Sequence, residues 1–319
     1  MSQTKIEWCD AVWNPTTGCS KVSEGCRYCY AERFAQRLAG RFGYPADDPF
    51  RVTLHPERLE EPLGWRKPRR VFVNSMGDLF HEDVPDEFIC RVFAAIALTP
   101  VKHRFLILTK RPHRMREFIL GLPQRDETFR LWVRAGGEWP LSNLWLGVTA
   151  ENQQAADERI PILLEIPAAV RFVSVEPMLG PVDLGRLVWF KDGFSSPAFQ
   201  EQMLGRRRLD WIVCGGETGP NARPCHPDWV RNLRDQCQAA GVPFFFKQWG
   251  QWNDLSSGNW IAPRKDTRVP WSDSYVLSHK NKIYEFLDGC RMFRMGKKTA
   301  GRLLDGQTWD EFPRQEVAG

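Results

Sequence analysis

The segment RVFVNSMGD, residues 70–78, joins a short apolar run to a polar end, and the same combination recurs along the chain. Runs that are almost continuously apolar are typical of strands buried on both faces of a sheet. We therefore predict strands at Arg70–Val73, Arg104–Leu108, Leu144–Val148, Val170–Val175, Trp211–Val213 and Pro243–Phe246.

Helical patterns lie between these runs. Asp86–Leu98 and Pro227–Ala240 have the spacing of amphipathic helices, and Ala31–Gly40 has a third such pattern ended by glycine. Strands that alternate with helices indicate a parallel sheet. The sequence thus predicts an α/β protein with a partial TIM-like (β/α) barrel of about six parallel strands.

Ionisable side chains follow the predicted strands. Active sites of such barrels are built from the loops at the carboxyl ends of the strands. A single residue there is most simply a solvated loop residue or a helix cap, but the recurrence at successive strand ends favours a site. The candidate catalytic residues are Lys110, Glu151, Glu176, Glu217 and Lys247, and Asp78 ends the segment quoted above.

Three cysteines lie in the segment GCSKVSEGCRYCYAE, residues 18–32, with the spacing C-x6-C-x2-C. Cys19, Cys26 and Cys29 occupy a loop that leads into the helix predicted after it. Helix N-terminal amides favour the thiolate form of a cysteine, which is the form that binds metal. We therefore predict a metal or iron–sulfur site with these three ligands and one open position.

The spacing leaves zinc and iron as alternatives. Cys9 or a distant histidine could complete a four-ligand zinc site, although the intervals differ from the repeated C-x2-C pairs of zinc ribbons. Iron–sulfur proteins use tight C-x2-C pairs in loops, which fits at least as well.

Composition and charge limit which partners and which cellular compartment the protein can have. The chain has 319 residues, a formal net charge of +5 and 14 tryptophans, which permits a nucleic-acid partner without requiring one. Nine cysteines, mostly scattered, and the lack of a signal-like or membrane-spanning stretch favour a cytoplasmic protein without membrane contact.

Three regions flank or interrupt the predicted barrel, which we place in residues 1–250. Residues 1–17 form a leader that Trp8 and Trp13 pack onto the body, and residues 183–208 form an insertion that ends in a basic run. Residues 251–319 form an aromatic and basic C-terminal extension that packs on the barrel or binds nucleic acid.

Segments spread over nearly the whole chain resemble the phage- and prophage-associated three-Cys-motif family. That family usually has threonine at the position of Cys9, which argues against Cys9 as a required ligand. The resemblance also implies a three-Cys-motif partner protein. The segments that carry it are TKIEWCDAVWNPTTGCSKVSEGCRYCYAERFA, VFVNSMGDLFHEDVP, FLILTKRPHRM, RFVSVEPMLGPVDL, DWIVCGGETGPNARP, VPFFFKQWG and GKKTAGRLLDG.

The cysteine motif also resembles, more remotely, that of the radical S-adenosylmethionine (SAM) enzymes of the spore photoproduct lyase type. Their motif is C-x3-C-x-aromatic-C after the first strand of a partial barrel. Cys26-Arg27-Tyr28-Cys29 matches its second half, whereas the first spacing is six instead of three.

This second resemblance implies cofactors and roles for particular residues. Cys19, Cys26 and Cys29 would hold a [4Fe–4S] cluster whose fourth iron binds SAM, and a flavodoxin- or ferredoxin-type protein would supply electrons. SAM would be cleaved to a 5′-deoxyadenosyl radical that acts on DNA or RNA. The expected cofactor contacts are Tyr28 at the adenine, Met76, Gly77 and Asp78 at the SAM amino group, Thr109 with Lys110 at its carboxylate or at substrate, and Glu151 with Glu176 at the ribose or substrate.

Two alternatives stay open. The chain could be a non-catalytic, zinc- or cluster-stabilised module that binds nucleic acid or docks a partner, which predicts a closed tetrahedral site without an adjoining cavity. It could also recognise the substrate while the partner protein supplies the catalysis.

Overall fold

The computed structural model describes residues 4–99, 102–125, 134, 136–185, 208–254 and 283–314. In these ranges the helices are α1 (Tyr30–Arg37), α2 (Asp86–Leu98), α3 (Pro112–Arg125), α5 (Gln153–Leu164), α8 (Pro227–Ala240) and α9 (Lys297–Ala300), with 3-10 turns η1 (Glu24–Cys26), η2 (Pro56–Arg58) and η3 (Glu61–Gly64). The strands are β1 (Ala11–Trp13), β2 (Thr16–Thr17), β3 (Thr53–Leu54), β4 (Arg70–Val73), β5 (Arg104–Thr109), β6 (Leu144–Thr149), β7 (Val170–Val175), β8 (Trp211–Gly215), β9 (Phe244–Gln248), β10 (Trp252–Asn253), β11 (Ile283–Glu285) and β12 (Arg291–Arg294).

The main sheet is parallel and curls into a half-barrel. Its strand order in the described part of the chain is β1-β4-β5-β6-β7-β8-β9. The order in space is therefore the order along the chain, and neighbouring strands pair in parallel. All six predicted strands are present with small changes of boundary. The seventh strand, β1, lies within the predicted leader and pairs with β4 through Ala11 to Trp13.

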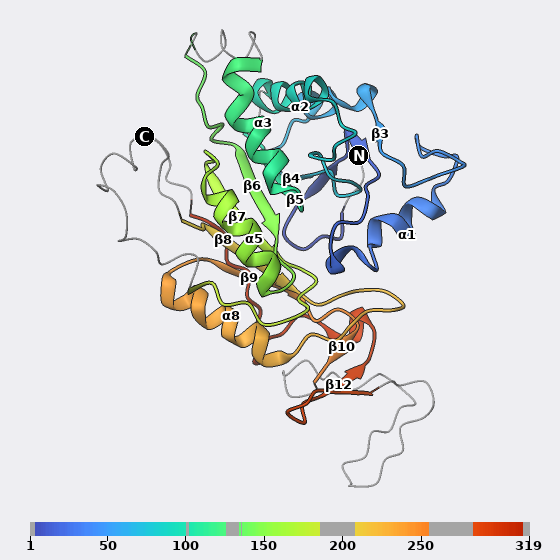
Figure 1. Ribbon diagram of the computed structural model, residues 1–319, viewed down its shortest axis with the longest axis vertical. Helices are drawn as coiled ribbons and strands as arrows, with labels where there is room; N and C mark the ends of the chain where they lie inside the picture. The colour runs from blue at the N-terminus through green and yellow to red at the C-terminus, as the bar shows by residue number, and fades with distance from the viewer. Residues whose placement is uncertain are drawn as a thin grey trace.

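Alternation of side chains gives the sheet two different faces. Val71 and Val73 face the core shared with the helices, whereas Phe72 faces the concave side. Helices α2, α3, α5 and α8 contribute side chains to the core that Val71 and Val73 face. Figure 1 shows α1 lying apart from these helices. The concave side is instead packed by Trp8 and Cys9 of the N-terminal segment.

The C-terminal extension contacts the half-barrel at β9. Asp310 bridges to Phe245, and the main-chain oxygen of Glu311 accepts a hydrogen bond from the Trp211 indole at 2.8 Å. The Phe312 ring packs on Trp211, with ring centroids 5.2 Å apart. A small antiparallel sheet, β10-β12-β11, belongs to the same extension. Residues 186–207 of the predicted insertion and 255–282 of the extension lie outside the described residues.

Candidate active site at the strand ends

The cysteine loop, residues 18–29, lies directly against the end of β4. Gly18 and Gly77 form a parallel bridge, and the Gly18 amide donates to the Met76 carbonyl at 2.9 Å. A Cβ atom on Gly77 would lie 2.7 Å from the Gly18 oxygen, so only glycine permits this approach. The predicted cofactor residues Met76 and Gly77 are thus brought next to Cys19.

Asp78 joins the ends of β4 and β5. The Thr109 hydroxyl lies 2.8 and 2.9 Å from its two carboxylate oxygens, and the Lys110 amide donates to Oδ2 at 3.2 Å. The Phe80 amide donates to Oδ1 at 3.0 Å. The carboxylate of Asp78 is buried and fully engaged, so its evident task is to hold the two strand ends together.

Arg111 connects Asp78 to Cys19, the first cysteine of the loop. Its guanidinium lies 3.3 Å from Cys19 Sγ, 2.7 Å from Ser20 Oγ and 3.4 Å from Asp78 Oδ2. Burial raises the pKa of Cys19 to about 11, with Asp78 adding to the rise and Arg111 opposing it. Our sequence analysis did not select Arg111, although it directly follows the candidate pair Thr109–Lys110.

Glu151 supports the middle of the loop. This fully buried carboxylate accepts from the Gly25 amide at 3.3 Å and pairs with Arg159 at 2.9 Å. Burial alone would raise the pKa of Glu151, but Arg159, a hydrogen bond from Ser23 and the nearby Lys110 lower it below its usual value. The Lys110 ammonium has no ion-pair partner within the described ranges.

Glu217 supports the end of the loop through Arg223. The Arg223 side chain donates to the two Glu217 oxygens at 2.6 and 2.8 Å and reaches Glu24 at 3.0 Å. The same guanidinium lies 5.2 Å from the centre of the Tyr28 ring, a distance at which cation–π attraction operates. Arg223, like Arg111, was not among the candidate residues selected from the sequence.

Glu176 and Lys247 form an ion pair of their own. Lys247 Nζ lies 2.8 and 3.0 Å from the Glu176 oxygens, and both side chains are mostly buried. Burial would lower the pKa of Lys247, but Glu176, together with Glu7 and Cys9, outweighs it and the pKa is raised. Sequence reasoning thus selected both members of a pair that joins the ends of β7 and β9.

Zinc and an iron–sulfur cluster make different demands on the positions of cysteine ligands. Among the described residues, no group of three or more His, Cys, Asp or Glu side chains is arranged to hold a metal ion. A single zinc ion needs all its sulfurs about 2.3 Å away from one point, whereas a cluster binds each thiolate on a separate iron. Cys19, Cys26 and Cys29 are free, partly exposed thiols on one loop, and their donor chemistry suits zinc as well as an iron–sulfur cluster.

Cys9 has a different environment. It packs in the apolar cluster on the concave side with Trp8 and Phe72, and its sulfur lies 4.0 Å from the Ile6 carbonyl. Burial in this apolar cluster raises the pKa of Cys9 to about 12. Cys9 therefore lies in the packed interior of the half-barrel, apart from the cysteine loop.

A cavity of about 200 Å³ adjoins the cysteine loop. Its lining comes from the loop, the start of α1 and the connection after β8, namely Arg27, Tyr28, Cys29, Glu32, Arg33, Thr218, Pro220 and Asn221. The last three residues of the cysteine loop, Arg27, Tyr28 and Cys29, therefore border an accessible space.

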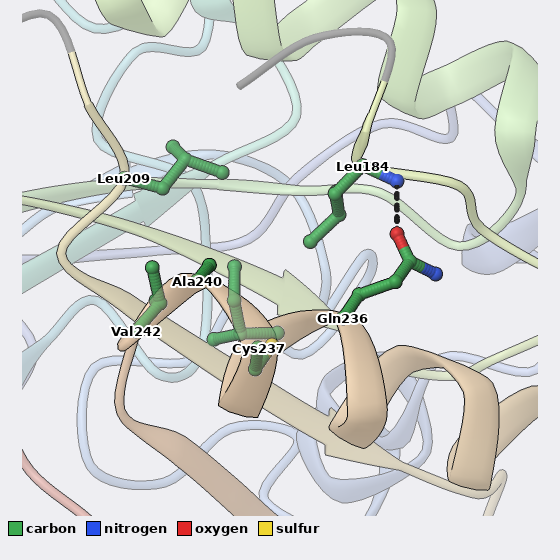
Figure 2. A pocket seen from close by; sticks show the side chains of 7 residues that line it. Leu184, Leu209, Gln236, Cys237, Ala240 and Val242 are labelled. Atoms are coloured by element: carbon green, nitrogen blue, oxygen red, sulfur yellow. Dashed lines mark hydrogen bonds between the residues drawn. The ribbon is translucent and has the colours of Figure 1, made fainter. Parts of the chain in front are cut away.

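A second pocket lies between β8, α8 and the segments around Leu184 and Leu209 (Figure 2). Gln236 Oε1 accepts a hydrogen bond from the Leu184 amide at 2.6 Å at its edge. Its volume of about 10 Å³ corresponds to a single water molecule, and most of its lining is apolar. It is a packing gap of the core, too small for a ligand.

A family described as "Protein of unknown function (DUF5131)" matches residues 3–313. The chain belongs to this family. Comparison with curated proteins and with solved structures found no match to the chain. In the described residues, no helix is long and apolar enough to cross a membrane.

Proposed function

We propose that this DUF5131 chain is a radical-SAM-like iron–sulfur enzyme that modifies or repairs nucleic acid. One observation carries the proposal. The cysteine loop follows the first strand of a parallel half-barrel, and Arg111, Glu151 and Arg223 hold it against the carboxyl ends of the other strands. Residues at those ends form the active sites of barrel enzymes.

Cys19, Cys26 and Cys29 would hold the [4Fe–4S] cluster. When bound, the cluster would supply one-electron reduction of SAM, and the radical chemistry would belong to the cofactors. The chain's own residues would position the cofactor. Met76 and Gly77 fix the end of β4 against the loop through main-chain hydrogen bonds to Asn14, Gly18 and Asn74. The Lys110 ammonium, which has no ion-pair partner among the described residues, offers a cation for a carboxylate.

The strand-end acids divide into two groups in this proposal. Asp78, Glu151 and Glu217 already accept hydrogen bonds from Thr109, Arg159 and Arg223, so they position the loop. Glu176 and Lys247 form a pair near the Tyr30 hydroxyl, and Glu176 helps to raise the pKa of that hydroxyl. This pair is our candidate for proton handling at the substrate.

A flavodoxin- or ferredoxin-type reductant, a three-Cys-motif partner protein and a cytoplasmic setting complete the proposal. All nine cysteines are free thiols, which suits a reducing compartment.

The alternative is a non-catalytic, metal-stabilised module that binds nucleic acid or docks a partner. The engagement of Asp78, Glu151 and Glu217 in structural pairs favours it, since these acids then hold the loop in place and do not contact a substrate. The cavity beside Cys29 favours the enzyme, because a closed structural metal site needs no adjoining space.

Iron, zinc and acid-labile sulfide analysis of anaerobically purified protein distinguishes the two. We expect about four irons per chain for a [4Fe–4S] site, lost in Cys19→Ser, Cys26→Ser and Cys29→Ser and retained in Cys290→Ser. Cys290 lies in the C-terminal extension, outside the loop. One zinc per chain without iron would contradict the enzyme proposal.

A further inference from the structure

Helix α1 presents two aromatic rings to solvent. Tyr30 and Phe34 are one helical turn apart and are 46% and 52% exposed. The opposite face is buried through Ala31 and Ala35. Large aromatics usually bury most of their surface, so a paired exposure on one face indicates a surface that binds something.

The Tyr30 ring is held in place although it is exposed. Its hydroxyl donates to the Ser75 carbonyl at 2.5 Å at the end of β4. Burial of the hydroxyl raises the pKa of Tyr30, with Cys29 and Glu176 adding to the rise, so the group stays protonated and keeps this bond. A ring fixed at its far end loses little conformational entropy when a planar ligand stacks on it.

Arginines flank the two rings. With 3.6 residues per turn, Arg33 and Arg37 lie on the same face as Tyr30 and Phe34. Neither arginine has an ion-pair partner in the described part of the chain: Arg33 donates to the Thr218 carbonyl at 3.2 Å, and Arg37 is exposed.

The acidic residue of this helix does not cancel that charge. Glu32 is paired with Lys21 at 3.0 Å. Arg33 also lines the cavity of about 200 Å³, so the positive face runs into a hollow beside Cys29. Arginine forks match the geometry of phosphate oxygens, and the uncompensated charge favours an anionic partner.

We infer that the exposed face of α1, formed by Tyr30, Arg33, Phe34 and Arg37, binds single-stranded nucleic acid. Bases stack on the two rings, and the arginines contact the backbone phosphates. A duplex keeps its bases stacked on one another and cannot offer them to the rings. This inference rests on the proposed function for its choice of nucleic acid as substrate and states which surface receives it.

The test is fluorescence anisotropy of the full chain with a labelled oligothymidylate and an oligouridylate of about 15 nucleotides, a length near the site sizes of single-strand binders. We expect Phe34→Ala to weaken binding about tenfold. Arg37→Gln should reduce the slope of log affinity against log salt by about 0.7. Matched controls on α2, Leu98→Ala and Arg91→Gln, remove an exposed apolar and an exposed basic side chain and should leave binding unchanged.

Three results would overturn the inference: equal loss in the controls and the α1 variants, tighter binding of duplex than of single strands, or a dimer that Phe34→Ala converts to a monomer. Metal content of the same samples separates this inference from the proposed enzyme. Single-strand binding that depends on α1 in a zinc protein supports the surface and rejects the enzyme. An iron–sulfur protein that binds no nucleic acid rejects the surface alone.

Discussion

Two glycines determine how closely the cysteine loop lies against the strand ends. A Cβ atom on Gly25 would lie 3.0 Å from the Glu151 carboxyl carbon, and one on Gly77 would lie 2.7 Å from the Gly18 oxygen. The first neighbour is a side chain that can adjust. The second is main chain, so only backbone movement could relieve the clash.

We therefore predict that Gly77→Ala lowers the free energy of unfolding by about 1–3 kcal/mol, the usual range for overpacking. Urea denaturation followed by fluorescence measures it. Gly64→Ala is the matched control, because no atom lies within 4 Å of its added Cβ, and it should change stability by less than about 0.5 kcal/mol. Equal effects of the two variants would show that the close approach of Gly18 and Gly77 is not maintained.

Glu151 gives a prediction about pH. Its folded pKa is lowered below the usual 4.5, so its contribution to stability is present above that value and is lost as pH falls through the folded pKa. At pH 7, Glu151→Gln leaves Arg159 buried without its partner, which costs about 3–5 kcal/mol. Denaturation at several pH values should show the difference between the two proteins shrinking below pH 4.5. A difference that stays constant with pH would contradict the buried ion pair.

At the scale of elements, the cysteine loop is a separate segment fastened by two arginines. Arg111 holds Cys19 and Ser20 to the end of β5, and Arg223 holds Glu24 to Glu217 after β8. The loop thus depends on strands that are distant from it along the chain.

Replacement of Arg223 by alanine should release the loop. The buried Glu217 would keep one of its donors, the main-chain amide of residue 223 itself. We expect a loss of about 2–3 kcal/mol in stability and faster amide hydrogen exchange over residues 18–29. Arg291→Ala is the control, because Arg291 forms an exposed ion pair with Glu285 that should contribute at most about 1 kcal/mol. Unchanged exchange in the loop of Arg223→Ala would show that other contacts hold it.

The sequence predicted the elements better than the connections between them. Six strands and the helices α2 and α8 follow from hydrophobic periodicity, because burial imposes a local pattern. The short strand β1 gives no such pattern, since three residues between polar neighbours carry too little signal. The acids at the strand ends could also be found, whereas the pairing of Cys19 with Arg111 depends on the tertiary fold and leaves no local trace.

At the scale of the whole molecule, both ends of the chain pack on the concave side of the half-barrel. Trp8 contacts Phe72, Phe172 and Trp211, and Phe312 contacts Trp211 and Phe245. The concave side is thus filled partly by residues from outside the repeating strand–helix units.

Phe312→Ala should therefore destabilise the half-barrel, although Phe312 lies in the extension. We expect a loss of about 2 kcal/mol, below the 3–5 kcal/mol of a fully buried phenylalanine because this ring is half-buried. Thermal unfolding with tryptophan fluorescence would report it, with the fully exposed Leu287→Ala as control. Two separate transitions, with only the smaller one shifted, would mean that the extension unfolds independently of the sheet.

Under the proposed function, Cys19, Cys26 and Cys29 would hold an iron–sulfur cluster to which SAM binds at the strand ends. Electron paramagnetic resonance of the anaerobic, dithionite-reduced protein, recorded with and without SAM, tests it most directly. The account predicts a reduced-cluster signal that shifts when SAM is added and that is lost in Cys26→Ser. A zinc protein without such a signal, or a cluster signal that SAM leaves unchanged, would contradict it.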